Sequence, residues 1–452
     1  MRTTGFSRSF FGCTAGLLFA AALFAAEPSS FPKLSITSDR LSFNMKTGET
    51  ITISGEMTED GKPAAGRLIH FAVYRNDRVL EHGYLPGDQK VVRTVKAEGP
   101  GTITMRLRAF TADKKPIQNE KKRAIWIGTG ALVDAEKILP AAPRPADFDE
   151  FWAAARKKLD EVPVKAVEVP FAVNPKRPNA KLVDVYDVKV DCAGGAPVSA
   201  YLMVPKNAQP KSLPAIVYYD GAGVRSAATI TGYGHRALVL ATNAHGIENG
   251  KPKEFYDDLW KKGRLKLYMW QNLDKPDELT PEKIYFYGMY LRVMRALDYI
   301  KSRPEWNGRD LIVIGPSQGG GQSIAAAALD PQVSLCIAKV PATGDHAAVL
   351  AGRAPGWPRF CKNAKDPNIQ KVLKNVSYFD NVYFAPRIKC ETWLSTGMND
   401  STCVPTSVVA VFNSLPEGTV KHLYIAPTGD HLTTGNPPAD AALNQLLKAR
   451  VK

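Results

Sequence analysis

Ser317 stands in a pattern that can turn a hydroxyl group into a nucleophile. The motif Gly315-Pro-Ser317-Gln-Gly319 follows the apolar residues 311–314 and precedes an alanine-rich run. β-Branched apolar residues favour a buried strand and alanine favours a helix, so the motif is predicted to lie in a strand–turn–helix unit. This is the context of a nucleophile elbow, where a sharp turn exposes the serine hydroxyl at the edge of a sheet. A glycine-rich turn without chemistry is the alternative, and partners for the serine decide between the two.

An acid and a base follow the serine in the order that such elbows use. Asp400 lies in the loop after a predicted strand, and His431 lies in the loop after the next one. We expect His431 to take the Ser317 proton, and Asp400 to fix the imidazole tautomer and stabilise its cation. Asp430 is a competing acid, but neighbouring side chains of an extended loop point apart.

Two backbone N–H groups are expected to stabilise the oxyanion of the reaction. The first belongs to Gln318, directly after the nucleophile. We assign the second to Ala222, in the loop Asp220-Gly-Ala-Gly223 that follows a predicted strand. This chemistry requires no metal ion and no organic cofactor.

Three further residues are predicted to contact the substrate. His346 lies one loop after the elbow, and His245 lies in a similar loop. Trp270 belongs to the irregular segment 243–280, whose aromatic side chains suit the binding of sugar rings. Ordinary loop packing explains that segment equally well.

The elements that position these residues follow the pattern of an α/β fold. From residue 182 onward strands and helices alternate, which is typical of a mostly parallel sheet with helices on both faces. A buried helix is predicted over residues 283–301 from the spacing of its apolar residues. The strands are predicted at 183–190, 198–204, 215–219, 237–241, 311–314, 333–339, 389–395 and 420–425.

A small all-β unit is predicted ahead of this fold. Residues 34–127 contain short alternating stretches separated by turn residues, which favours an immunoglobulin-like sandwich. A proline-rich joint follows. The predicted division of the chain is a signal peptide at 1–26, the β-sandwich at 27–130, a linker at 131–146 and an α/β catalytic domain at 147–452.

The N-terminus and the composition indicate where the protein is located and which partners it can bind. Residues 1–26 have the basic start, the short apolar run and the small residues of an export signal, which predicts a secreted or periplasmic protein without a membrane span. The formal net charge is +15, which would suit an anionic partner such as an acidic polysaccharide. The basic residues are dispersed, which disfavours nucleic acid as a partner.

Five cysteines follow the predicted signal peptide. None is spaced as a metal ligand would be, so we predict no zinc site. An odd number leaves at least one free thiol, and the sequence does not assign a disulfide. The five are Cys192, Cys336, Cys361, Cys390 and Cys403.

Four motifs together give the chain a family resemblance over roughly residues 140–450. They are Gly315-x-Ser-Gln-Gly-Gly-Gly321, Arg303-Pro-Glu-Trp306, Phe148-Asp-Glu-Phe-Trp152 and Gly397-Met-Asn-Asp-x-x-Cys403. The chain resembles the acetyl xylan esterase/cephalosporin C deacetylase family (carbohydrate esterase family 7). The resemblance implies an α/β-hydrolase fold, with Ser317 as nucleophile, Asp400 as acid, His431 as base and Gln318 as an oxyanion amide. It also implies a homo-oligomer, since several members of the family form hexamers.

The sequence departs from the family pattern near the expected site. Residues 220–222 are Asp-Gly-Ala where the family has His-Gly-Tyr, and residues 245–247 are His-Gly-Ile where it has Arg-Gly-Gln. Val404 stands where a proline is common. The N-terminal β region is also additional to the family pattern, and it could block the oligomer that the family forms. These departures concern the substrate and the assembly more than the chemistry.

We therefore expect an exported serine esterase that removes O-acetyl groups from acetylated, xylan-type oligo- or polysaccharides through an acyl-enzyme intermediate. Hydrolysis of another carbohydrate ester, such as the methyl ester of an acidic sugar, is the alternative within enzymes. A non-catalytic glycan-binding protein on a hydrolase scaffold is the alternative from another class.

Overall fold

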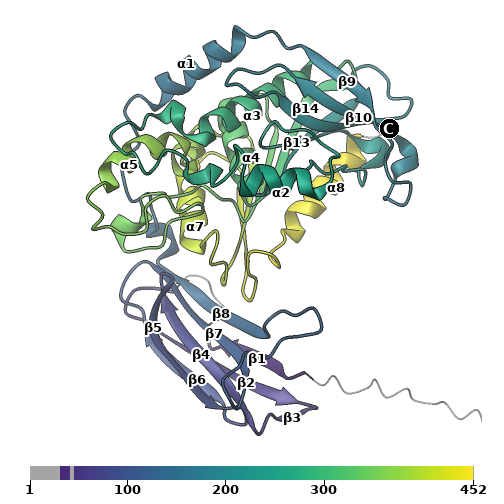
Figure 1. Cartoon of the computed structure of the whole chain (residues 1–452). Coiled ribbons are helices and arrows are strands. Elements are labelled where there is room, and N and C mark those ends of the chain that lie inside the picture. Colours follow the sequence, from purple (N-terminus) through teal and green to yellow (C-terminus); the bar gives the residue numbers. More distant parts are fainter. Residues whose placement is uncertain (1–30, 41–44, 451–452) are drawn as a thin grey trace, which may run out of the picture.

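The computed structural model describes residues 31–40 and 45–450, and the predicted signal peptide lies outside them. A β region forms the N-terminal part of the chain, and a larger part with a central sheet and surrounding helices follows it (Figure 1). Loops of the larger part reach toward strand β8 of the β region (Figure 1). Among the described residues, no helix has the length and apolar character needed to span a bilayer.

A nine-stranded sheet forms the centre of the larger part. Its order is β17-β16-β15-β14-β12-β13-β11-β10-β9. The six strands from β17 to β13 pair in parallel, and β11, β10 and β9 pair antiparallel. The strands are β9 (Ala166–Pro170), β10 (Val183–Val190), β11 (Val198–Pro205), β12 (Leu213–Tyr219), β13 (Leu238–Asn243), β14 (Trp306–Pro316), β15 (Leu335–Lys339), β16 (Glu391–Gly397) and β17 (Lys421–Ala426). Every predicted strand of this part is present, and β9 was not predicted.

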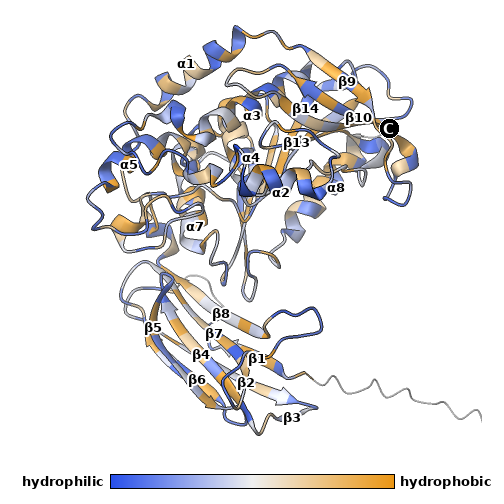
Figure 2. Ribbon diagram, viewed as in Figure 1, coloured by the Kyte–Doolittle hydropathy of each residue, from blue (hydrophilic) through white to orange (hydrophobic). Residues whose placement is uncertain are grey.

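Helices cover both faces of this sheet, as the sequence predicts. Val313 points into the large apolar cluster that contains α3, α4 and α7, whereas its neighbour Ile312 packs in the cluster that contains α8. Alternate strand residues therefore supply the two cores. Hydrophobic residues concentrate on the central strands, and the exposed helix α2 is largely hydrophilic (Figure 2). The helices are α1 (Phe148–Asp160), α2 (Lys253–Lys261), α3 (Tyr285–Ser302), α4 (Gln318–Leu329), α5 (Ile369–Val376), α6 (Asn381–Phe384), α7 (Pro405–Ser414) and α8 (Pro437–Arg450).

The β region consists of two antiparallel sheets with an apolar core. One has the order β1-β2-β3 with β6 also paired to β2, and the other has the order β5-β4-β7-β8. The core side chains include Ile51, Ile69, Phe71, Met105 and Leu107. The strands are β1 (Lys33–Ser38), β2 (Thr50–Glu59), β3 (Lys62–Pro63), β4 (Arg67–Arg75), β5 (Arg78–Pro86), β6 (Val91–Lys96), β7 (Gly101–Thr111) and β8 (Trp126–Val133).

Strand β8 joins the β region to the rest of the molecule. It continues past residue 130, where the predicted β-sandwich ends. Leu132 near its end is buried in the core of the larger part, whereas its neighbours Ala131 and Val133 are buried in the core of the β region. The alternation of a single strand therefore anchors the two parts to each other.

Two glycines allow the sharp turn between β14 and α4. A Cβ atom on Gly319 would lie 2.0 Å from the carbonyl oxygen of Tyr219, and one on Gly315 would lie 2.4 Å from the same atom. Both glycines therefore let β12, β14 and α4 approach more closely than any side chain would permit.

Gly319→Ala should destabilise the fold by about 3 kcal/mol, because its methyl group would overlap backbone atoms that cannot move aside. Thermal or urea unfolding measures this loss. Gly418→Ala is the matched control, because no atom lies within 4 Å of a Cβ placed there. Equal stability of the two variants would contradict the close packing described for the turn.

Candidate active site

The ends of three parallel strands bring the predicted reactive residues together. Ser317 follows β14, Asp400 lies three residues after β16, and His431 lies five residues after β17. Because these strands run in parallel, their carboxyl ends meet at one edge of the sheet, where open α/β sheets bind ligands. Residues separated by 114 positions in the sequence therefore become neighbours.

The backbone of Ser317 has the unusual conformation of an elbow. Its φ is 56° and its ψ is −122°, a backbone conformation that residues other than glycine rarely adopt. The surrounding strands hold it there: its N–H donates to the carbonyl of Lys339 at 2.9 Å, and its carbonyl accepts from the N–H of Ala342 at 2.9 Å. The strained turn is thus fixed by β15 and the loop behind it.

A chain of hydrogen bonds connects the serine, the histidine and the aspartate. His431 Nε2 lies 3.0 Å from Ser317 Oγ, and His431 Nδ1 lies 2.8 Å from Asp400 Oδ2. A carboxylate only accepts hydrogen bonds, so Nδ1 carries the proton and Nε2 accepts from the serine hydroxyl. The imidazole can therefore remove the serine proton as the hydroxyl attacks.

Asp400 is held in place from its other side as well. Its Oδ1 accepts hydrogen bonds from the backbone N–H groups of Thr402 and Cys403, each at 2.8 Å. The side chain has no exposed surface, whereas 21% of the His431 side chain is exposed. The carboxylate is thus fixed below the imidazole, and the imidazole reaches the solvent side where a substrate would arrive.

The competing acid Asp430 has a different task. Its Oδ1 accepts from the N–H of Leu432 at 2.9 Å and from both the N–H and the hydroxyl of Thr433 at 2.8 Å. Burial acts to raise the pKa of Asp430, but these hydrogen bonds outweigh it and hold the pKa below its ordinary value. Asp430 therefore shapes the loop that carries His431.

The loop 220–223 lies against the elbow, as the predicted role of Ala222 requires. A Cβ atom on Gly221 would lie 3.7 Å from the Cβ atom of Ser317. Arg225 holds this loop through hydrogen bonds to the carbonyls of Ala222 (2.9 Å) and Gly221 (3.3 Å) and to Asp220 Oδ2 (2.9 Å). Sequence reasoning missed Arg225. Gln318 is the first residue of α4, where N–H groups have no partner within the helix.

His245 supports this loop from behind and is not placed to touch a substrate directly. Only 2% of the residue is exposed. Its Nε2 donates to the carbonyl of Gly223 at 3.1 Å, and its Nδ1 accepts from the Tyr285 hydroxyl at 2.6 Å. Burial lowers the pKa of His245 to about 3, which keeps the imidazole neutral in this arrangement.

The other two predicted substrate contacts differ from each other. His346 has no exposed surface and its ring packs edge-on against Phe360, so the structure does not place it where a substrate could reach it. Trp270 keeps 37% of its surface exposed, and its indole N–H donates to the carbonyl of Pro358 at 3.0 Å. Spacing along the sequence did not reveal how deeply the loop after β15 is buried.

A buried thiol lies beside the proposed nucleophile. Cys403 is completely buried, and burial raises the pKa of its thiol well above its ordinary value, so the group stays protonated. The Ser317 hydroxyl lies close enough to lower this pKa slightly. All five cysteines of the described residues are free thiols, and those residues contain no group of acidic, histidine and cysteine side chains that could hold a metal ion.

Comparison with known proteins identifies the family. The model of the family described as acetyl xylan esterase (AXE1) matches residues 131–448. The chain belongs to this family. A curated relative, the acetyl esterase Axe7A of Xylanibacter ruminicola, is 30% identical over 343 residues, which cover 73% of this chain and 72% of that protein. The protein is therefore a carboxylic ester hydrolase.

Solved structures of the acetyl xylan esterase family share the fold. The acetyl xylan esterase from Paenibacillus sp. R4 aligns with a TM-score of 0.57 and 27% identity, over 70% of this chain and 98% of its own. Acetyl xylan esterase 1 from Thermoanaerobacterium sp. JW/SL YS485 aligns with a TM-score of 0.56 and 20% identity, over 70% and 97% of the two chains. The larger part of the molecule has the α/β-hydrolase fold of this esterase family.

Asp400→Asn should reduce kcat by about 10⁴-fold, because an amide at this position favours the wrong tautomer of His431. Asp430→Asn should reduce kcat far less, since it only weakens the hydrogen bonds of the loop that carries His431. Steady-state hydrolysis of a small acetyl ester, measured for both variants, distinguishes them. A larger loss in Asp430→Asn would show that the acid has been misassigned.

His245 should make stability depend on acidity. Since its pKa is near 3 in the folded chain and near 6.5 in the unfolded chain, unfolding takes up a proton between these values, and stability must fall as the pH falls from 6.5 toward 3. His245→Phe should reduce this slope by about 1.4 kcal/mol per pH unit. Urea unfolding between pH 4 and 6 measures it, and an unchanged slope would contradict a neutral, buried His245.

Proposed function

We propose that this protein is a serine esterase that removes O-acetyl groups from acetylated, xylan-type oligo- or polysaccharides. The hydrogen-bonded series Ser317–His431–Asp400 on a nucleophile elbow carries this proposal. Membership of the acetyl xylan esterase family supports the acetyl group and the carbohydrate as the two halves of the substrate.

The reaction would proceed in two halves through an acyl-enzyme. His431 Nε2 takes the Ser317 proton while the serine oxygen attacks the acetyl carbonyl carbon. The tetrahedral intermediate collapses, His431 gives the proton to the sugar oxygen, and the sugar alcohol leaves. A water molecule, deprotonated by His431, then attacks the acetyl-serine and forms a second tetrahedral intermediate. This intermediate collapses, His431 returns the proton to the serine oxygen, and acetate is released.

The N–H groups of Gln318 and Ala222 would stabilise the negative charge on the carbonyl oxygen. Both belong to segments that packing has already fixed: Gln318 begins a buried helix, and Arg225 and His245 hold the carbonyls of the 220–223 loop. Donors that are already oriented need no reorganisation when the charge forms, which is the source of their catalytic effect.

The export, the N-terminal domain and the assembly of the enzyme form a second part of the proposal. We propose that residues 1–26 direct export, on the basis of their basic start and short apolar run. We also propose that residues 27–130 form an immunoglobulin-like domain, which two antiparallel sheets around one core support. A homo-oligomer, which the family resemblance implies, remains a prediction.

Acetate release from a small acetyl ester and from acetylated xylo-oligosaccharides tests the proposal, with Ser317→Ala beside the wild type. We expect release from both substrates and a loss of about 10⁶-fold in kcat for Ser317→Ala, since nucleophile and base act as a unit. The variant should unfold at the same temperature as the wild type. Acetate release that survives the substitution would contradict the assignment of the nucleophile.

A further inference from the structure

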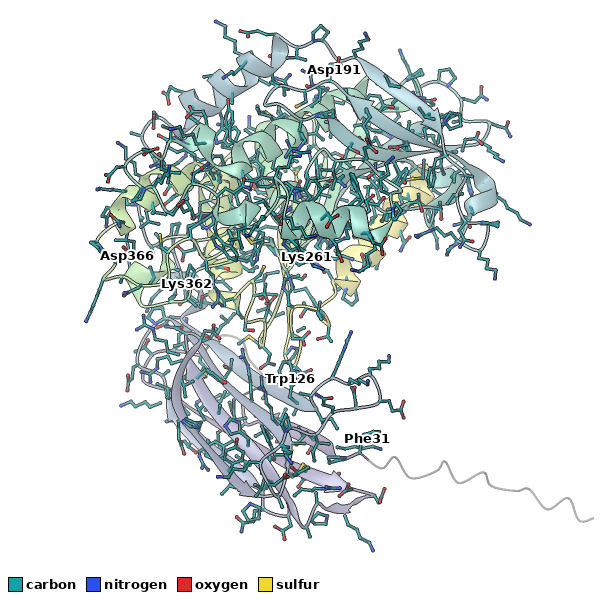
Figure 3. All side chains as sticks on the ribbon, in the orientation of Figure 1. Phe31, Trp126, Asp191, Lys261, Lys362 and Asp366 are labelled. Atoms are coloured by element: carbon teal, nitrogen blue, oxygen red, sulfur yellow. The ribbon has the colours of Figure 1, made fainter. Side chains whose placement is uncertain are left out.

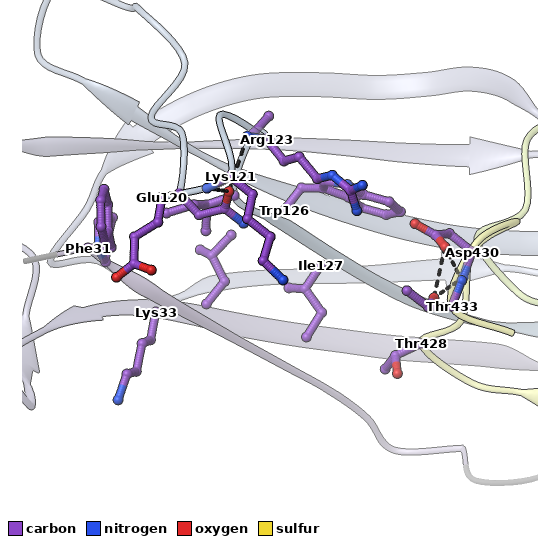
Figure 4. A pocket seen from close by; sticks show the side chains of 15 residues that line it. Phe31, Lys33, Glu120, Lys121, Arg123, Trp126, Ile127, Thr428, Asp430 and Thr433 are labelled. Atoms are coloured by element: carbon purple, nitrogen blue, oxygen red, sulfur yellow. Dashed lines mark hydrogen bonds between the residues drawn. The ribbon is translucent and has the colours of Figure 1, made fainter. Parts of the chain in front are cut away.

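A cleft runs from His431 along the boundary between the β region and the α/β part. A hollow of about 360 Å³ is lined by His431 and Leu432 on one side and by Arg106, Arg108 and Trp126 on the other. A second hollow of about 920 Å³ continues from it toward Lys33, and Trp126 and Asp430 line both. Trp126 and Asp430 lie at one end of this second hollow, and Phe31 and Lys33 lie at the other (Figure 4).

Strand pairing places the β-region side of the cleft on one face of its sheet. Arg108 on β7 lies directly opposite Trp126 on β8, and Arg106 lies opposite Gly128. Residues two apart on a strand share a face, and so do directly paired residues. Figure 3 shows Trp126 at the end of the β region that faces the α/β part. The face opposite the β-region core is thus turned toward His431.

Direct contacts fix this face against the loop that carries Asp400. Arg106 Nη2 donates to the carbonyl of Asn399 at 3.3 Å. A Cβ atom on Gly128 would lie 2.1 Å from Asn399 Oδ1, so only glycine permits this approach. In the turn between β4 and β5, Asp77 pairs with Arg359 at 3.2 Å, and Arg359 also donates to the carbonyl of Ser401. These contacts hold the β region in place, and it therefore forms one wall of the cleft.

The charge of the cleft is mainly positive. Five cationic side chains line the two hollows, against two carboxylates, Glu120 and Asp430; the five are Lys33, Arg106, Arg108, Lys121 and Arg123. Arg108 is exposed, and within the described residues its side chain takes part in no ion pair or hydrogen bond. A cation without a protein partner beside a half-buried tryptophan is suited to bind a carboxylate on a sugar.

We propose that the β region completes the substrate cleft and binds an acidic sugar substituent of the acetylated oligosaccharide. Trp126 packs against a sugar ring next to the acetylated residue, and Arg108 pairs with the carboxylate of a uronic acid side group. This inference rests on the proposed function, and it names the substrate as an acetylated oligosaccharide that carries uronic acid. The departures from the family pattern at residues 220–222 and 245–247 alter the α/β side of the site. Arg108 and Trp126, by contrast, precede residues 131–448, which match the family model.

The test compares kcat/KM for two acetylated xylo-oligosaccharides of equal length, one with a uronic acid substituent and one without. We expect the wild type to prefer the acidic substrate by about tenfold or more, the effect of one charge-assisted hydrogen bond. Arg108→Gln should remove most of this preference, and Arg108→Lys should retain part of it. Raising the ionic strength should reduce the preference of the wild type, because salt screens the attraction.

Lys62→Gln is the control variant, since it removes one exposed positive charge from β3, in the other sheet of the β region, and should leave the preference unchanged. A wild type that treats both oligosaccharides alike would overturn the inference, as would a preference that survives Arg108→Gln. A failure of the proposed function has a different signature. In that case neither oligosaccharide nor a small acetyl ester would release acetate in a Ser317-dependent way.

Discussion

The buried carboxylate of Asp400 constrains the arrangement of the residues at the carboxyl ends of the parallel strands. A charge without exposed surface is costly unless hydrogen bonds replace the water that it has lost. Here two backbone N–H groups and the imidazole of His431 do so. Because the loops after β16 and β17 must both supply donors at fixed positions, the orientation of His431 follows from the need to satisfy Asp400. That orientation in turn directs Nε2 toward Ser317.

The same loop connects chemistry to recognition. The residue before Asp400, Asn399, is the one that Gly128 and Arg106 of the β region contact. The β region is therefore packed on the loop that holds the acid, and its outer face continues the cleft beyond His431. Substrate recognition by this face and proton transfer at His431 would thus share one rigid support, which is how an enzyme keeps a bound ester in line with its nucleophile.

Local patterns in the sequence were sufficient to predict much of this arrangement. The elbow, the strands that flank it and the loop positions of Asp400 and His431 follow from apolar runs and turn residues that each lie within a few positions. Strand β9 was not predicted because it has only five residues and its apolar side chains, Val167 and Val169, are open to solvent, so that no buried face marks it in the sequence.

Features that depend on distant contacts could not be predicted. His245 was expected to touch the substrate, yet its partners are Gly223 and Tyr285, 22 and 40 positions away, and they make it a buried support. The place of Trp126 beside His431 depends on how the β region packs against the loops after β16 and β17, and no short stretch of sequence predicts that packing.

Reaction with a fluorophosphonate, which forms a stable ester with an activated serine, tests the central claim most directly. Digestion and mass spectrometry would locate the adduct and follow its rate in the wild type and in His431→Ala. The hydrogen-bonded series predicts a single adduct on Ser317, formed roughly a hundredfold or more slowly without the imidazole. An adduct on another residue, or labelling of Ser317 at an unchanged rate in His431→Ala, would contradict it.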